Sequence, residues 1–131
     1  MDFVMSGDPV VKCRVLRQEN IYRDRHIYTT FEPAGISDYP TIVIIPGALQ
    51  NSQKHEYVGF RLACQNTRVV FAPVSLLRTD IRDSFDELVI QTMDFLDHIR
   101  KKHGEVKSVA GHSLGGLIAI RMALLDSKSA Y

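Results

Sequence analysis

The sequence predicts an α/β fold with a mostly parallel sheet and an antiparallel hairpin at its N-terminal end. Two runs in which apolar and polar residues alternate open the chain. Three strand-like patterns then follow, each succeeded by a helix-like pattern. When helices connect successive strands in this way, the strands lie parallel in one sheet. Because no internal repeat or low-complexity segment interrupts the pattern, residues 1–131 are expected to form a single domain.

The first two predicted strands form the hairpin. Residues 10–16 alternate between apolar and polar side chains, and residues 26–31 repeat this period of two, which is typical of half-buried strands. The polar segments Gln18-Glu19-Asn20 and Arg23-Asp24-Arg25 are interpreted as the connection between them.

Two buried strands and a helix follow the hairpin. A turn-rich segment, residues 33–40, leads to Thr41–Ile45, a continuous run of mostly β-branched residues that Pro46-Gly47 closes. A run that is apolar on both faces is typical of the middle of a sheet covered on both sides. A weakly patterned helix is expected from Ser52 to about Gln65, and a second buried strand over Arg68–Pro73.

The C-terminal third contains the clearest helix. Ser84-Phe85-Asp86-Glu87 is a capping box, apolar residues then recur at three- and four-residue spacing, and Lys101-Lys102-His103-Gly104 supplies cations and a glycine at the end. A strand is expected over Val106–Ala110. The last helix, which comes after this strand, is apolar nearly all round its first turns, as in a helix packed deep against a sheet.

Composition and charge argue against several classes of function. Sixteen basic and fifteen acidic residues leave a net charge of +1, and the basic residues are scattered, so nucleic-acid binding is not expected. The longest apolar runs, such as Thr41–Pro46, are far shorter than the roughly 20 residues of a membrane span. The N-terminus carries acidic residues and no apolar core, unlike a secretory signal.

The cysteines and histidines do not suggest a metal site. Cys13 and Cys64 lack metal-type spacing, and none of the five histidines forms a pattern such as His-x-x-x-His. The simplest interpretation is two free thiols in a reducing, cytoplasmic environment, with a disulfide between them as the alternative. No metal and no cofactor are expected.

The chemistry-bearing motif is Gly111-His112-Ser113-Leu114-Gly115, which lies between the last predicted strand and the last helix. Gly-x-Ser-x-Gly in this context is the pattern of a nucleophile elbow, a sharp turn that exposes a serine at the C-terminal end of a strand. Gly111 and Gly115 are needed where a Cβ would collide with the neighbouring strand and helix. The pattern predicts Ser113 as a nucleophile.

Two backbone amides are placed to stabilise an oxyanion beside this serine. In an open α/β sheet, ligands sit beyond the carboxyl ends of the strands. One predicted strand ends in Ile45-Pro46-Gly47-Ala48, and another ends in the serine motif. The amides of Leu114 and Ala48 are therefore the expected donors to the developing negative charge.

These two loops and the order of elements together resemble the N-terminal portion of an α/β-hydrolase, in its lipase-like and esterase-like form. The resemblance implies the strand order 1-2-4-3-5, Ser113 as nucleophile, an oxyanion hole from Ala48 and Leu114, and support of the elbow by Gly111, His112 and Gly115. It also implies a serine hydrolase of carboxylic esters or thioesters that forms an acyl-enzyme on Ser113. Pro46 replaces a histidine that many members carry there, which changes little because the donor is the next backbone amide.

The sequence departs from the family on the C-terminal side of the serine. Family triads run in the order Ser, then Asp or Glu, then His, but residues 114–131 contain Asp126 and no histidine. The triad histidine and acid are therefore expected to be missing from this chain, and the domain to be incomplete at its C-terminus. Among the upstream histidines, His55 at the start of the first helix is the alternative base, whereas His112 is interpreted as structural.

An incomplete sheet predicts an exposed edge. The strand over residues 106–110 would carry unpaired backbone groups, and the last helix would lose part of its cover. The alternative function is accordingly a non-catalytic α/β-hydrolase-like fragment that binds a partner through this open edge, either another chain that completes the sheet or a second copy.

Overall fold

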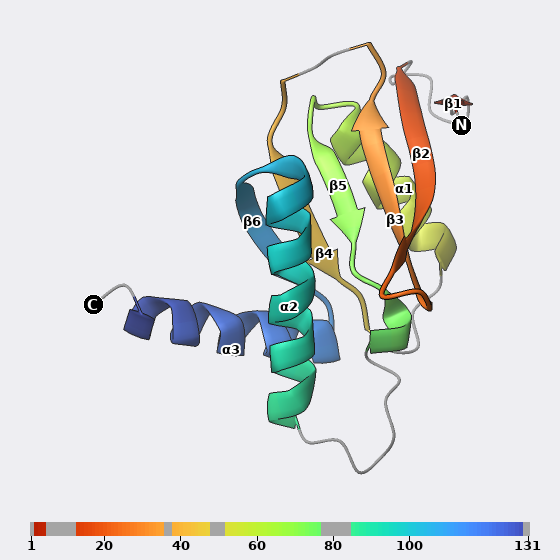
Figure 1. The fold of residues 1–131 in the computed structure, drawn as a ribbon. Coiled ribbons are helices and arrows are strands. Elements are labelled where there is room, and N and C mark those ends of the chain that lie inside the picture. The colour runs from red at the N-terminus through yellow and green to blue at the C-terminus, as the bar shows by residue number, and fades with distance from the viewer. Residues whose placement is uncertain (1, 5–12, 36–37, 48–51, 77–84, 130–131) are drawn as a thin grey trace.

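The structure, a computed structural model, describes residues 2–4, 13–35, 38–47, 52–76 and 85–129 (Figure 1). It contains one six-stranded sheet in the order β1-β2-β3-β5-β4-β6. The strands are β1 Asp2–Val4, β2 Arg14–Tyr22, β3 His26–Pro33, β4 Thr41–Ile45, β5 Arg68–Phe71 and β6 Val106–Gly111. The helices are α1 Ser52–Ala63, the short 3-10 helix η1 Val74–Leu76, α2 Phe85–His103 and α3 Leu114–Ser129.

The predicted α/β class and strand order are confirmed. Strands β4, β5 and β6 lie parallel, and β2 and β3 form the antiparallel hairpin, with β3 also antiparallel to β5. Without β1, the order β2-β3-β5-β4-β6 is the expected 1-2-4-3-5. Strand β1, which pairs with the start of β2, was not predicted from the sequence.

The hairpin is longer than predicted. Gln18-Glu19-Asn20 was interpreted as a connection, but these residues belong to β2 and pair with residues 28–30 of β3. Polar side chains are compatible with a strand here because β2 has solvent-facing positions near the margin of the sheet. The reversal is made by Arg23 and Asp24, whose φ angles of 53° and 61° suit a tight hairpin turn. Residues 10–12 lie outside the described part.

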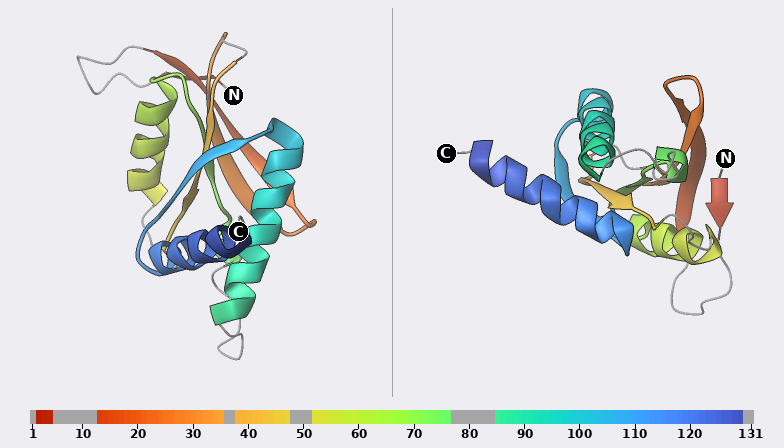
Figure 2. Two further views of the ribbon diagram at one scale, coloured as in Figure 1. Left: turned by 90° about the vertical axis from the view of Figure 1, so that its left-hand side faces the viewer. Right: turned by 90° about the horizontal axis from the view of Figure 1, so that it is seen from below.

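The sheet lies between α1 and α2 (Figure 2), and an apolar layer covers each of its faces. On one face, α2 and α3 pack against alternate residues of the strands, including Val43, Ile45 and Val70. On the other face, α1 packs against the residues between them, including Phe31 and Val69. Ile42 and Ile44 of β4 join this second layer, so β4 is covered on both faces as its apolar run predicted.

Helix α1 lies very close to the sheet at one point. A Cβ on Gly59 would lie closer than 3.0 Å to ring atoms of Phe31, a separation that real Cβ atoms essentially never show. The missing side chain therefore lets α1 approach β3, and it brings the first turn of the helix near the carboxyl ends of β4 and β5.

Helix α2 confirms the predicted periodicity. Of the predicted periodic residues, Leu88, Val89, Leu96 and Ile99 are buried, Met93 is partly buried, and Phe85 at the first position is exposed. The helix ends at His103, and the next residue, Gly104, has a φ of 87° and an amide that donates to the carbonyl of Arg100 at 2.8 Å. Ser84, the cap of the predicted capping box, lies outside the described residues.

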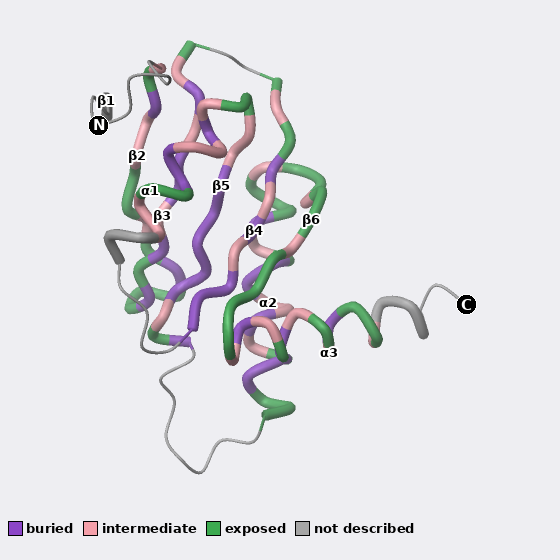
Figure 3. The backbone as a smooth tube through the Cα atoms, turned by 180° about the vertical axis from the view of Figure 1, so that it is seen from behind, coloured by how far each residue is buried: buried purple, intermediate pink, exposed green. Residues whose placement is uncertain are grey.

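Strand β6 and helix α3 are less covered than the other elements. Strand β6 is the last strand of the described sheet and most of its residues are exposed (Figure 3). Ile118 and Met122 of α3 are buried, but Leu117, Ile120 and Leu124 expose 59%, 61% and 52% of their surface. The expected exposed edge and apolar patch are thus present, and deep burial of the whole helix is not.

The prediction of two free thiols is wrong. Cys13, just before β2, and Cys64, just after α1, are joined in a disulfide with a Cα–Cα distance of 5.8 Å. The two cysteines are separated by 51 positions, so sequence spacing alone did not reveal that the fold brings them together. The cytoplasmic location, which rested on free thiols, remains a prediction.

Removing this disulfide is expected to destabilise the fold. Replacing Cys13 and Cys64 by serine releases a long loop in the unfolded chain, which should lower the free energy of unfolding by about 2–4 kcal/mol. Urea titrations under non-reducing conditions measure the difference. The same titrations with dithiothreitol are the control, because both proteins then lack the cross-link and their midpoints should coincide. If the unfolding midpoints of the two proteins differ in dithiothreitol, the loss of stability in the variant comes from changed packing at the two positions and not from the missing cross-link.

Candidate functional site

The centre of the candidate site is the turn from β6 into α3, residues 111–116. Ser113 has a φ of 57°, in the left-handed region that residues with a side chain seldom adopt. Backbone bonds close the turn, since the amide of Gly115 donates to His112 at 2.9 Å and that of Gly116 to Ser113 at 2.9 Å. Ser113 is exposed, so its hydroxyl stands at the carboxyl end of β6 in contact with solvent.

The two motif glycines allow three backbone segments to meet. A Cβ on Gly111 would lie closer than 3.0 Å to the carbonyl oxygen of Gly115. A Cβ on Gly115 would lie as close to the carbonyl oxygen of Ile45, at the end of β4. Gly116 differs, because its nearest such contact is 3.4 Å away. The expectation that Gly111 and Gly115 avoid collisions therefore agrees with the geometry.

The turn is also bound to β4 by a hydrogen bond. The amide of His112 donates to the carbonyl of Ile45 at 3.1 Å. The amide of Leu114 stands at the first position of α3, where a helix has no carbonyl of its own to accept the bond. This amide is therefore oriented outward at the positive end of a helix. Ala48, the other predicted donor, lies outside the described residues.

His55 lies close enough to this turn to interact with it electrostatically. Its ring stacks on Phe71, with centroids 5.2 Å apart and an interplanar angle of 24°. Burial lowers the pKa of His55, and the neighbouring His112 lowers it further. A neutral imidazole therefore stands on α1 near the carboxyl ends of β4 and β5. Asp126 belongs to α3, about 18 Å along the helix from Leu114.

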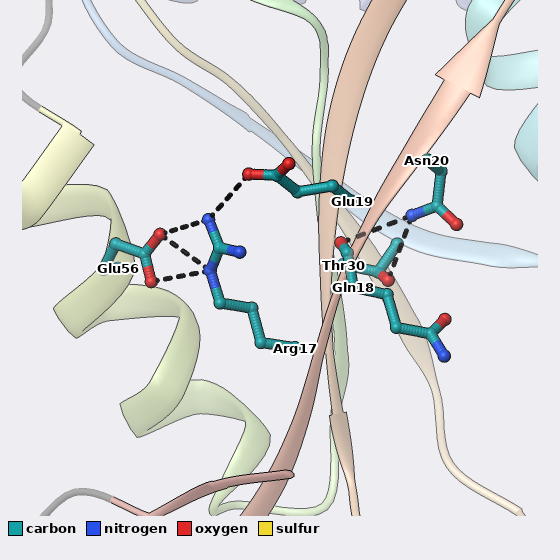
Figure 4. Close-up of polar contacts among 6 residues, drawn as sticks. All are labelled: Arg17, Gln18, Glu19, Asn20, Thr30 and Glu56. Atoms are coloured by element: carbon teal, nitrogen blue, oxygen red, sulfur yellow. Dashed lines mark hydrogen bonds and ion pairs between the residues drawn. The ribbon is translucent and has the colours of Figure 1, made fainter. Parts of the chain in front are cut away.

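A cavity of about 310 Å³ adjoins His55 on the α1 face of the sheet. Arg17 stands at its side between Glu56 of α1 and Glu19 of β2 (Figure 4). The guanidinium Nε lies 2.8 and 2.9 Å from the two carboxylate oxygens of Glu56, and Nη2 lies 3.4 Å from Glu19. The sequence alone did not predict this cluster because its members come from β2 and α1, 39 positions apart, and no local motif marks them.

Nothing in the described part of the chain gathers three histidine, cysteine, aspartate or glutamate side chains in a way that could hold a metal ion. Among the described helices, none has the length and apolar character needed to cross a membrane.

The sequence matches no protein-family model and no curated protein. Its fold does match solved structures, among them esterases, putative lipases and a thioesterase domain. Three of them are a thioesterase domain from the curacin biosynthetic pathway, Est1E from Butyrivibrio proteoclasticus, and brefeldin A esterase, a bacterial homologue of human hormone sensitive lipase.

These likenesses define the fold of the chain. Sequence identities are 20%, 15% and 20%, TM-scores are 0.59, 0.60 and 0.53, and the matches cover 87%, 86% and 88% of this chain. The chain spans only 43%, 46% and 36% of the three proteins. It therefore has the fold of part of an α/β-hydrolase.

Substituting one motif glycine tests whether the stability of the turn depends on the close backbone contact of Gly115 with Ile45 or only on the helix propensity of the residue. Gly115→Ala would force the backbone of α3 away from Ile45, and we expect a loss of about 2–4 kcal/mol in the free energy of unfolding, as for other severe overpacking and strain. Gly116→Ala is the matched control, since it has room and gains helix propensity, and its stability should be unchanged or slightly higher. Chemical denaturation of the two variants measures both. Equal stability would mean that the turn does not need this contact.

The pKa of His55 should be below 6.5, because burial disfavours its charged form. The unfolded chain then binds the proton more readily than the folded one, so the free energy of unfolding falls as the pH drops below about 6.5. An NMR titration of the His55 ring measures the pKa, and His112→Asn should raise it by removing the second cause. A His55→Asn variant should lose part of the pH dependence of stability. A titration midpoint above 6.5 would contradict the burial of the ring.

Proposed function

We propose that this chain carries the nucleophile and oxyanion-binding half of a serine hydrolase that acts on carboxylic esters or thioesters. The observation that supports it most is the left-handed backbone of Ser113 between a strand and a helix. Such strain is uncommon in a residue with a side chain and is concentrated at functional sites. A simple strand-to-helix turn would not need an exposed serine in this conformation.

The reaction would begin with attack of the Ser113 hydroxyl on the carbonyl carbon of the ester or thioester. The carbonyl oxygen becomes negative in the tetrahedral intermediate, and the outward amide of Leu114 would donate to it, together with that of Ala48. Expulsion of the alcohol or thiol leaves an acyl group on Ser113, which water then removes. No cofactor takes part in these steps.

The proton of Ser113 needs an acceptor, and the proposal places the triad histidine and acid outside these 131 residues. No histidine follows Ser113 in the sequence. His55 is a neutral imidazole near the turn, but it stacks on Phe71. We therefore assign His55 to the wall of the site and assign the base to residues that would extend the sheet beyond β6.

A second candidate function is a non-catalytic module that binds a partner through the open edge of β6. The exposed residues of β6 and the apolar stripe of Leu117, Ile120 and Leu124 favour it. Both candidates require the sheet to be extended past β6, by the same chain, by another protein or by a second copy. The reactivity of Ser113 distinguishes them, because only the hydrolase needs an activated serine.

Labelling with a fluorophosphonate probe tests the proposal. Because the base is assigned to residues outside these 131, the experiment uses the protein with those residues present, and we expect labelling at Ser113 that Ser113→Ala loses. Ser108→Ala is the control, since Ser108 is an exposed serine on β6 outside the turn and its loss should leave labelling unchanged. Equal labelling of the native protein and Ser113→Ala would remove Ser113 from the mechanism. Absence of labelling in every form, even with the residues that supply the base present, would favour the binding module.

A further inference from the structure

The proposed reaction does not account for the cavity beside His55. Its described lining comes from the floor of the sheet, the first turn of α1 and the segment after β5, and comprises Arg17, Glu19, Ile27, Tyr28, Thr29, Phe31, Pro46, His55, Glu56, Phe71, Ala72 and Val74. Its volume, about 310 Å³, is roughly twice that of an engineered apolar cavity that holds one benzene molecule. It is at the small end of the range of ligand pockets and suits a group of modest size.

One end of the cavity lies at the carboxyl ends of β4 and β5, the edge of the sheet at which the serine turn is bonded to β4. Pro46 lines it directly after Ile45, whose carbonyl accepts the amide of His112 in the serine turn. Ala72 lines it directly after β5, and its amide donates to Ile44 at 2.9 Å. His55, the third residue at this end, interacts electrostatically with His112. A substrate held at Ser113 could therefore place one of its substituents in the cavity.

The walls of the cavity determine which substituent fits. One part is apolar, with Ile27, Phe31 and Val74 among its residues, and favours alkyl or aryl groups. The polar part contains one guanidinium and two carboxylates, since Arg17 meets both Glu56 and Glu19 (Figure 4). Because His55 is neutral near pH 7, the described charged groups of the lining sum to one negative charge.

Arg17 is not available to bind an anion. Its Nε and Nη2 groups are both directed to Glu56, and Nη2 also approaches Glu19, so its positive charge is already compensated. Among the described lining residues the remaining charge is negative and no cation is free, so an anionic substituent would lose its hydration without gaining an ion pair from them. An uncharged group meets no such penalty, and a cationic group gains the attraction of Glu19.

Building on the proposed function, we propose that this cavity is a specificity pocket which accepts a short, uncharged or cationic substituent of the ester and rejects an anionic one. Glu19, at the exposed side of the cavity, is the residue that sets the preference for charge, and Arg17 with Glu56 forms the rigid polar wall. The substrate class is thus an ester or thioester with a small non-anionic group.

Three probes of similar shape test the pocket without relying on catalysis: butylammonium, butyramide and butyrate. Their binding to the Ser113→Ala protein is measured by NMR titration, with the shifts of Thr29, His55 and Ala72 as reporters. We expect butylammonium to bind about two- to fivefold more tightly than butyramide, within the range of exposed ion pairs, and butyrate to bind most weakly. Butyrate binding as tightly as the other two, or shifts confined to other residues, would overturn the proposal.

A matched pair of variants then tests the role of Glu19. Glu19→Gln should remove the preference for butylammonium over butyramide, whereas Glu105→Gln, which removes an exposed carboxylate between α2 and β6, should retain it. Equal preference in both variants would contradict the assignment of Glu19.

The two proposals can fail separately. If Ser113 is not labelled by the fluorophosphonate but the probes bind in the expected order, the hydrolase proposal is contradicted and the pocket proposal is retained. If Ser113 is labelled but the three probes do not bind in the expected order of affinity, only the pocket proposal is contradicted.

Discussion

The close approach of the serine turn to the end of β4 is the constraint on which the candidate site depends. The amide of His112 donates to Ile45, and Gly115 lies against the same carbonyl with no room for a side chain. This contact holds the start of α3 against the carboxyl end of the sheet. It also keeps Ser113 in its left-handed conformation, which costs about 1–3 kcal/mol and needs firm surroundings to persist.

The elements around this contact divide into two groups with different tasks. Strands β4 and β5, covered on both faces, form the floor at whose carboxyl ends His55 and the cavity lie, and the serine turn is bonded to the end of β4. The hairpin and α1 form one wall of the site and are linked by the Cys13–Cys64 disulfide and by Arg17 with Glu56. On the opposite side, β6 and the exposed stripe of α3 lack an equivalent neighbour among the described residues, so the site is well supported on one side only.

Local and periodic features of this fold could be predicted from the sequence, and long-range pairings could not. The runs at 41–45 and 68–71 and the spacing in α2 carry their structure in their own residues, as does the glycine pattern at 111–115. Residues 18–20 were predicted to be a connection because they are polar. They form a strand through pairing with residues 28–30 of β3, which their own sequence does not reveal. The disulfide and the Arg17 cluster depend on side chains that only the folded chain brings together, and β1 is too short to show a period.

The structure of a phosphonate adduct tests the central claim most directly, because it reports both the reacting atom and the group that stabilises the oxyanion. We predict a covalent bond from the Ser113 oxygen to phosphorus, with the phosphoryl oxygen about 2.7–3.1 Å from the amide nitrogen of Leu114. A phosphonate attached to any other side chain would contradict this assignment. So would an adduct on Ser113 whose phosphoryl oxygen points away from the start of α3.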